Sequence, residues 1–437
     1  MTEYRDATLG DLLRERRTTL GMTMREVAGS TLSPTAVNNI EKGKIRPTIE
    51  TVLYLCDVLG LQPEQALIFY PDLSKSISAL FEVVNRKLEA KKTDESIALL
   101  YDMYWVATEQ PDHENLIALI QMKIASVFGD HGRFESARDG MNEAYKYFLI
   151  HKDIPRQIEV LNSLGDYALA EFQRSVALSY YKQAVELGPR YHVTDTVVGE
   201  SYCKLAHIHF LDGKMEEALR LSRAAEAVFR AQVSPDGEPL EDGDGIARCA
   251  LQQASILIML DEVSDALATA RSAYDHFQAT DNRPHLGRAA RVLGDVLRHC
   301  GDSSAARDYY HQAYRLKKVD APAHLHNIER RLVELELSLG RIAEARRLAE
   351  EALARLEDPY QCSRFYKLLA QCDFQSRNID GYIVQMNHAV AALKEAGIDY
   401  AAALVQCELA DVTNDFNLMR EATRILRNWY GEYTRYS

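Results

Sequence analysis

One short segment near the beginning of the chain carries residue types that can read DNA. Segment 33–43 opens with Ser33, a good helix N-cap, and Pro34, which suits the first helical position. Val37 and Ile40 lie three residues apart and can face a small core. The polar residues that remain on the other faces are Thr35, Asn38 and Asn39. The segment therefore predicts a short recognition helix.

Basic residues follow this segment closely. Gly43 is expected to end the helix, and the positive charges beside its polar face come from Lys42, Lys44 and Arg46. Lysine and arginine at such a position bind phosphates. We expect the backbone at Thr23 and Ser33 to contact phosphates as well. Double-stranded DNA is then the expected partner.

No residue pattern indicates catalysis or a metal site. The chain has no Walker loop, no G-x-S-x-G and no H-E-x-x-H motif. His207 and His209 are two residues apart, which on a helix directs their rings to different faces. The seven cysteines are scattered without a C-x-x-C pair, so we expect reduced core thiols. These patterns predict a protein that is not an enzyme and holds no cofactor or metal.

Four further helices are expected around the recognition helix, over residues 9–20, 23–28, 48–60 and 63–69. Thr23 and Glu26 have the spacing of a capping box, which favours a helix start there. Tyr70-Pro71 then marks a boundary. We therefore expect a small five-helix domain over residues 1–70 and a second domain over residues 71–437.

This first domain resembles the Xre/Cro-type helix-turn-helix domain over residues 8–69. The residues that carry the resemblance are Leu9-Gly10, Leu13, Arg17, Gly21, Val27-Ala28, Ile40-Glu41-x-Gly43 and Arg46-Pro47. The resemblance implies that Arg17 pairs with Glu41. It also implies base contacts, which fall on Pro34, Thr35 and Asn39, with Asn38 nearby. The alternative is a small helical domain without a role in nucleic-acid binding.

From about residue 75 the sequence repeats roughly every 40 residues. The residues that recur at the start of a second helix are Ala98, Ala137, Ala177, Ala218, Ala266, Ala306, Ala345, Tyr382 and Ala422. Small residues at such intervals let antiparallel helices approach closely and stack into a solenoid. The pattern resembles lengthened tetratricopeptide (TPR) repeats, with a HEAT-like solenoid as the alternative. A turn-rich insertion over residues 234–245 is expected to be a loop that acts as a hinge.

The first helix of each TPR pair lines the concave surface of the array. The residues of this chain at the corresponding offsets, called the groove set below, are Glu159, Asn162, Asp166, Glu200, His207, Arg248, Arg288, Arg291, Asn327, Arg330, Arg364 and Lys367. Asparagine can hold a peptide backbone, and arginine and lysine can take a terminal carboxylate. Because the early members are acidic and the late ones basic, we expect a short peptide to bind along the groove in one direction, with its C-terminal carboxylate at the late members. The alternative is an ordinary solvated helix face.

The whole chain resembles the RRNPP family of cytoplasmic quorum-sensing regulators. The likeness rests on a short-turn helix-turn-helix, in which Ala28 and Glu41 are 13 residues apart, and on about nine 40-residue repeats. It implies an all-α fold with a right-handed TPR-like superhelix, a signalling peptide in the groove and homodimerisation. The apolar C-terminal end that could form the dimer contact contains Phe416, Leu418, Leu426, Trp429, Tyr430, Tyr433 and Tyr436. Capping of this end by the last helix itself is the alternative.

The charge balance restricts how DNA can be bound. The net charge is −13, and residues 1–69 hold 8 basic against 9 acidic residues. DNA binding must therefore depend on a local basic cluster. No apolar run approaches the roughly 20 residues of a membrane span, so we expect a cytoplasmic protein. Two other functions stay open, a scaffold that acts on a partner protein and a DNA-binding regulator that senses a metabolite.

Overall fold

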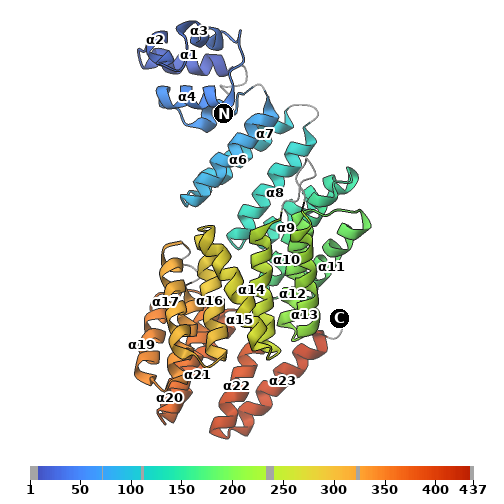
Figure 1. Ribbon diagram of the computed structural model, residues 1–437, viewed down its shortest axis with the longest axis vertical. Coiled ribbons are helices and arrows are strands. Elements are labelled where there is room, and N and C mark those ends of the chain that lie inside the picture. Colours follow the sequence, from blue (N-terminus) through green and yellow to red (C-terminus); the bar gives the residue numbers. More distant parts are fainter. Residues whose placement is uncertain (1–7, 71, 110–112, 233–240, 321–324, 434–437) are drawn as a thin grey trace. The chain divides into compact units, whose positions relative to one another are not determined.

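A computed structural model describes residues 8–70, 72–109, 113–232, 241–320 and 325–433 (Figure 1). Within these ranges the chain forms twenty-three helices and no strand, which confirms the all-α fold. The chain divides into two compact units, Met1–Val193 and Thr194–Ser437. Each unit is described by itself below.

The first unit begins with five short helices. They are α1 (Leu9–Thr19), α2 (Met24–Ala28), α3 (Pro34–Glu41), α4 (Ile49–Leu59) and α5 (Pro63–Leu67). Thr23 and Glu26 form the expected capping box at the start of α2. A Cβ on Gly10 of α1 would lie 2.5 Å from the backbone oxygen of Glu41. Glycine therefore lets α1 approach the end of α3, which positions the recognition helix.

Three helix pairs complete the first unit. They are α6 (Leu73–Glu89) with α7 (Thr93–Thr108), α8 (Glu114–Asp130) with α9 (Phe134–Ile150), and α10 (Ile154–Ala170) with α11 (Arg174–Arg190). One apolar core runs from Leu9 in α1 to Tyr167 in α10. Lys87 of α6 also pairs with Glu64 of α5 at 2.9 Å. The small N-terminal domain is thus packed onto the first repeat helix.

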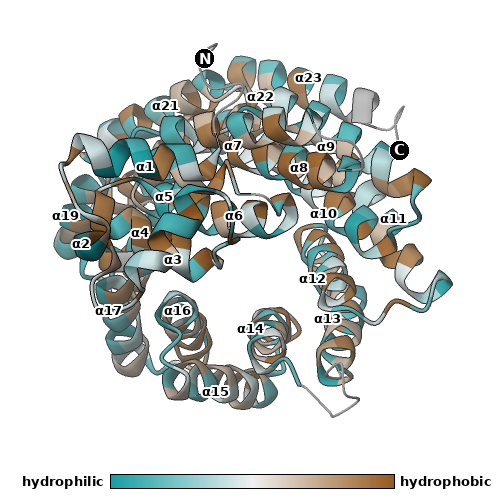
Figure 2. Ribbon diagram, turned by 90° about the horizontal axis from the view of Figure 1, so that it is seen from above, coloured by the Kyte–Doolittle hydropathy of each residue, from teal (hydrophilic) through white to brown (hydrophobic). Residues whose placement is uncertain are grey.

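Six helix pairs form the second unit. They are α12 (Thr196–Leu211) with α13 (Met215–Arg230), α14 (Gly243–Met259) with α15 (Val263–Ala279), α16 (Arg283–His299) with α17 (Ser303–Asp320), α18 (His326–Ser338) with α19 (Ile342–Leu353), α20 (Pro359–Gln375) with α21 (Ile379–Glu395), and α22 (Asp399–Thr413) with α23 (Phe416–Tyr433). Figure 2 shows α12, α14 and α16 as one row of neighbours. The second helices of these pairs, α13, α15 and α17, lie on the outer side of this row.

Small residues bring the two helices of a pair together, as the repeat pattern predicts. A Cβ on Gly165 would lie 2.4 Å from the Tyr181 ring, and one on Gly294 would lie 2.6 Å from the Tyr310 ring. In the first pair, however, Ala98 does not occupy the buried position that the repeat pattern predicts. Ala98 is exposed, and the buried residue at the fourth position of α7 is Ser96.

Residues 234–240 of the expected hinge loop lie outside the described residues, and the end of the insertion belongs to α14, which already begins at Gly243. Asp242 caps this helix by accepting a hydrogen bond from the Gly245 N–H at 2.8 Å. A Cβ on Gly243 would lie 2.8 Å from the His276 ring, and one on Gly245 would lie 2.6 Å from a phenylalanine ring of α13. Gly243 and Gly245 therefore let α14 pack closely on side chains of α13 and α15, although the glycine-rich sequence suggested that no helix would form there. The hinge stays a prediction; the two compact units divide between α11 and α12.

Candidate DNA interface and peptide groove

The recognition helix α3 has the buried and exposed faces that the sequence predicts. Ser33 caps it by accepting a hydrogen bond from the Ala36 N–H at 3.1 Å, and Val37 and Ile40 are buried. Pro34 and Thr35 are exposed. The side chains of Asn38 and Asn39 are half-buried. The polar face of α3 is therefore accessible to a ligand.

A buried ion pair holds α3 against α1. Arg17 donates to both carboxylate oxygens of Glu41, at 2.6 and 2.9 Å, and also to the backbone oxygen of Met22 at 3.1 Å. The Glu41 side chain is only 3% exposed. The hydrogen bond from Arg17 to Glu41 raises the pKa of Arg17 above its ordinary value. This confirms the pairing that the resemblance implied.

The basic residues beside α3 are available for phosphates. Lys42, Lys44 and Arg46 are all exposed, and none has an acidic partner within the described part of the chain. Thr23 differs, because its N–H already donates to the Glu26 carboxylate at 2.7 Å. A phosphate at Thr23 would have to compete with that carboxylate. Its role in phosphate binding stays a prediction, as do the other DNA contacts.

The groove set has three members in the first unit, all on α10. Glu159 pairs with Arg156 at 2.6 Å, and Asp166 accepts a hydrogen bond from the Tyr181 hydroxyl at 2.7 Å. Asn162 is buried, with 6% of its surface exposed. The Glu159 and Asp166 carboxylates are thus engaged by neighbouring side chains. Their roles in binding a peptide stay predictions.

In the second unit, most of the basic groove residues are neutralised by acids. Glu200 pairs with Arg248 at 2.7 Å and Lys367 with Glu408 at 2.9 Å. The ion pairs around Asp295 and Glu334 include Arg291, Arg298, Arg330 and Arg331. The separation of charges seen along the sequence therefore largely disappears in space, because the next turn of the same helix or an adjacent helix supplies the opposite charge.

Arg288 on α16 and Arg364 on α20 are the two arginines of the groove set without an ion pair in the described residues, and of these Arg288 is the exposed one. It has no acidic partner among the residues that the structure describes, and its side chain is exposed. Desolvation nevertheless lowers the pKa of Arg288, and the charge of Arg291 lowers it further. The Arg288 side chain is thus exposed and, within the described chain, unpaired, in contrast to the half-buried Arg364. Arg288 is therefore the basic member of the groove set best prepared to receive an anion.

The other groove residues have weaker or different contacts. Arg364 donates to Gln361 at 3.4 Å and lies 6.0 Å from the centre of the Tyr360 ring. Asn327 is half-buried. His207 is exposed and stacks on the Phe210 ring with centroids 6.4 Å apart. The neighbouring His209 is buried, so the two rings lie on different faces as expected.

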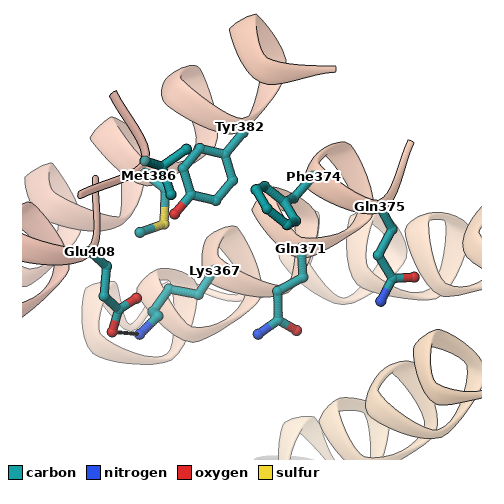
Figure 3. A pocket seen from close by; sticks show the side chains of 8 residues that line it. Lys367, Gln371, Phe374, Gln375, Tyr382, Met386 and Glu408 are labelled. Atoms are coloured by element: carbon teal, nitrogen blue, oxygen red, sulfur yellow. Dashed lines mark hydrogen bonds and ion pairs between the residues drawn. The ribbon is translucent and has the colours of Figure 1, made fainter. Parts of the chain in front are cut away.

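A small cavity lies beside Lys367, and sequence analysis did not predict it. It has a volume of about 240 Å³. The residues that line it are Lys367, Gln371, Phe374, Gln375, Tyr382, Met386, Glu408 and Val412 (Figure 3). The Phe374 and Tyr382 rings lie 5.6 Å apart and form its apolar side. Little in the sequence indicates this cavity, because only the structure shows that the aromatic side chain of Phe374 is 52% exposed.

The C-terminal end is covered in part by the last helix itself. Trp429 stacks on Tyr400 with ring centroids 4.8 Å apart, and Leu418 packs on the core below. Phe416 is 84% exposed. Tyr436 lies outside the described residues. The side chains of Tyr430 and Tyr433 are likewise outside the described residues, and the dimer contact stays a prediction.

The described residues contain neither a membrane-spanning helix nor a cluster of metal ligands. Within those ranges no helix is long and apolar enough to cross a membrane. The same residues include no cluster of three or more histidine, cysteine or acidic side chains that could hold a metal ion.

Comparison with known proteins identifies the first domain and the fold of the whole. Residues 8–67 match the family described as "Helix-turn-helix domain". No curated protein matches the chain. A Rap protein complexed with competence and sporulation factor is 14% identical, with a TM-score of 0.55 over 83% of this chain and 100% of that one. The apo quorum sensor NprR from B. thuringiensis is 16% identical, with a TM-score of 0.51 over 82% and 98%.

These likenesses confirm the architecture expected from the resemblance, a helix-turn-helix domain followed by TPR-like repeats. The same repeat fold also occurs in a signal-transduction ATPase with a tetratricopeptide sensor from Pyrococcus horikoshii. That protein is 15% identical, with a TM-score of 0.51 over 92% of this chain and 65% of that chain. At such identities the likeness defines the fold, and the function must be argued from the sites.

Proposed function

We propose that this protein is a cytoplasmic transcriptional regulator that binds double-stranded DNA through α3. The observation that carries the proposal is the exposed polar face of α3 beside three cations without acidic partners, Lys42, Lys44 and Arg46. A rigid support behind this face, the Arg17–Glu41 pair, keeps α3 in one orientation. In a chain of net charge −13, such a local cluster is what DNA binding requires.

The test of this proposal is the sequence preference of the protein. Asn39 can form paired hydrogen bonds with adenine, whereas Pro34 offers only apolar contact. We expect Asn39→Ala to weaken binding to a selected cognate site by about 1–3 kcal/mol and to relax one base position. The measurement is selection from random DNA, followed by titration. An unchanged base preference would contradict the role of Asn39.

The repeats are proposed to sense a short peptide, with its terminal carboxylate at Arg288. An exposed arginine without an acidic partner in the described residues can form charge-assisted hydrogen bonds with a carboxylate. The shared fold with NprR, described as a quorum sensor, supports a sensing role. We further propose that the peptide changes DNA binding by favouring one arrangement of a homodimer.

A native mass spectrum of the purified protein tests the ligand class. A bound species that fragments into amino-acid residues would support a peptide sensor. A bound metabolite would replace that proposal with a metabolite-sensing regulator. The same spectrum reports whether the protein is a dimer, and a monomer at micromolar concentration with and without ligand would contradict the assembly proposed here.

A further inference from the structure

Two cysteines of the second unit lie side by side, although they are far apart in the sequence. Cys203 on α12 and Cys249 on α14 have their sulfur atoms 3.4 Å apart. Both are free thiols. Sulfur atoms in a disulfide are about 2.05 Å apart, so the two need to approach by about 1.4 Å to bond. No other pair of sulfur atoms in the described residues has a recorded contact.

Further contacts hold the two helices in this position. The Gln252 side chain of α14 donates to the backbone oxygen of Cys203 at 2.9 Å. Arg248 of α14 pairs with Glu200 of α12 at 2.7 Å. These links lie on both sides of the thiol pair along α14. The sulfur atoms are therefore placed together by the packing of two helices and not by one side-chain rotamer.

The two thiols differ in their surroundings. Cys249 is fully buried, whereas Cys203 is half-buried and so partly accessible. Arg248 and Arg288 both interact electrostatically with Cys203, which places positive charge near the sulfur that solutes can reach. The hydrogen bond with Cys203 raises the pKa of Cys249 well above its ordinary range, and burial raises it further. Cys249 therefore stays a thiol and Cys203 is the sulfur that meets an oxidant.

We propose that Cys203 and Cys249 form a redox modification site that closes to an intramolecular disulfide on exposure to a peroxide. The Cys203 thiol gives its proton to solvent, the thiolate attacks one peroxide oxygen, and the O–O bond breaks with hydroxide as the leaving group. Hydroxide takes up that proton, so one sulfenic acid and one water form. The Cys249 sulfur then attacks the sulfenic sulfur, and its proton departs with the hydroxyl group as a second water. Two thiols lose two electrons and two protons in total, and hydrogen peroxide is reduced to water.

The disulfide would join the first helices of two successive repeats. In the reduced protein, α12 and α14 are held only by side-chain contacts, and the covalent bond would fix their spacing. A thiol-disulfide exchange protein or a small thiol could reverse the reaction. This site is independent of the proposed DNA and peptide functions, because neither is needed for the oxidation.

Peptide mapping of the full-length protein under non-reducing conditions tests the site. After treatment with hydrogen peroxide, we expect a peptide that joins Cys203 to Cys249, with a mass about 2 Da below the sum of the two thiol peptides. Dithiothreitol should remove it. Cys300 is the matched control, since it is exposed and has no sulfur partner in the described residues. Cys300→Ser should leave the cross-link unchanged.

Variants of the pair identify the order of the two steps. In Cys249→Ala, dimedone should label a sulfenic acid at Cys203, because no second thiol is present to resolve it. In Cys203→Ser, Cys249 should stay reduced. The proposal is wrong if the wild type keeps both thiols free while Cys300 is oxidised, or if Cys203 proceeds to a sulfinic acid without forming the cross-link. Mapping of the wild type decides this even if a variant fails to fold.

Discussion

The surface around α3 and the row of first helices in the second unit both carry clusters of basic residues, but the clusters are built differently. Lys42, Lys44 and Arg46 are exposed and have no acidic partner in the described chain. In the repeats, Arg330 contacts Glu334, and burial lowers the pKa of Arg330 to about 10. Among the arginines and lysines of the groove set, Arg288 resembles the cations beside α3 in being exposed and in lacking an acidic partner within the described residues, whereas Arg364 lacks an acid but is half-buried. Basic residues therefore indicate a binding site only where no carboxylate already neutralises them.

The largest effect is expected from the ion pair that supports the DNA-binding surface. Arg17→Ala would leave the Glu41 carboxylate buried without a partner, which costs about 3–5 kcal/mol. Hydrogen exchange of amides in α1 and α3 measures this loss locally. Lys42→Ala is the control and should leave the exchange unchanged. If Arg17→Ala exchanges like the wild type, the pair does not stabilise the domain.

The next effect concerns Arg288, the exposed arginine of the groove set that has no acidic partner in the described residues. Arg288→Gln should weaken binding of the peptide by about 1.5–3 kcal/mol, the size of a hydrogen bond to a charged group. Amidation of the peptide should cost the wild type a similar amount and cost Arg288→Gln little. Isothermal titration measures both. Arg330→Gln serves as the matched control, because Glu334 already neutralises the charge of Arg330. An equal loss of peptide affinity in that variant would contradict the proposal that only an arginine without an acidic partner binds the carboxylate.

A smaller effect is expected from a single cation beside α3. Lys44→Gln should weaken binding to all DNA sequences alike and reduce the slope of log affinity against log salt by about 0.9. Titrations at several salt concentrations, with cognate and random DNA, measure that slope. A loss confined to the cognate site would show that Lys44 reads bases instead of phosphate.

The smallest effect is a dependence of peptide binding on pH. Burial, together with the charges of Arg248, Arg288 and Lys317, lowers the pKa of His285, and Asp244 opposes this only in part. An anion at Arg288 would raise that pKa again, so binding takes up a proton. Affinity should therefore rise a few-fold as the pH falls below the ordinary histidine value of about 6.5 and should level off below the lowered pKa. His285→Gln should remove the slope.

Local features of the DNA-binding domain could be predicted from the sequence because they depend on residues close together in the chain. The Ser33 cap and the capping box of Thr23 and Glu26 are satisfied within one helical turn. The repeat pattern likewise predicts the helix pairs, because small residues such as Gly165 must lie where a second helix approaches. The Arg17–Glu41 pair is longer in range, and only the family resemblance indicated it.

The tertiary structure alone decided which charges, glycines and thiols meet across helices. The partners Glu200 and Arg248 are 48 positions apart, and Cys203 and Cys249 are 46 apart. Likewise, Gly243 looked like a helix breaker, but it admits the His276 ring of the next helix. The physical reason is that hydrophobic periodicity determines which face of a helix is buried, whereas the neighbour on that face depends on the rotation and translation of whole helices as they pack.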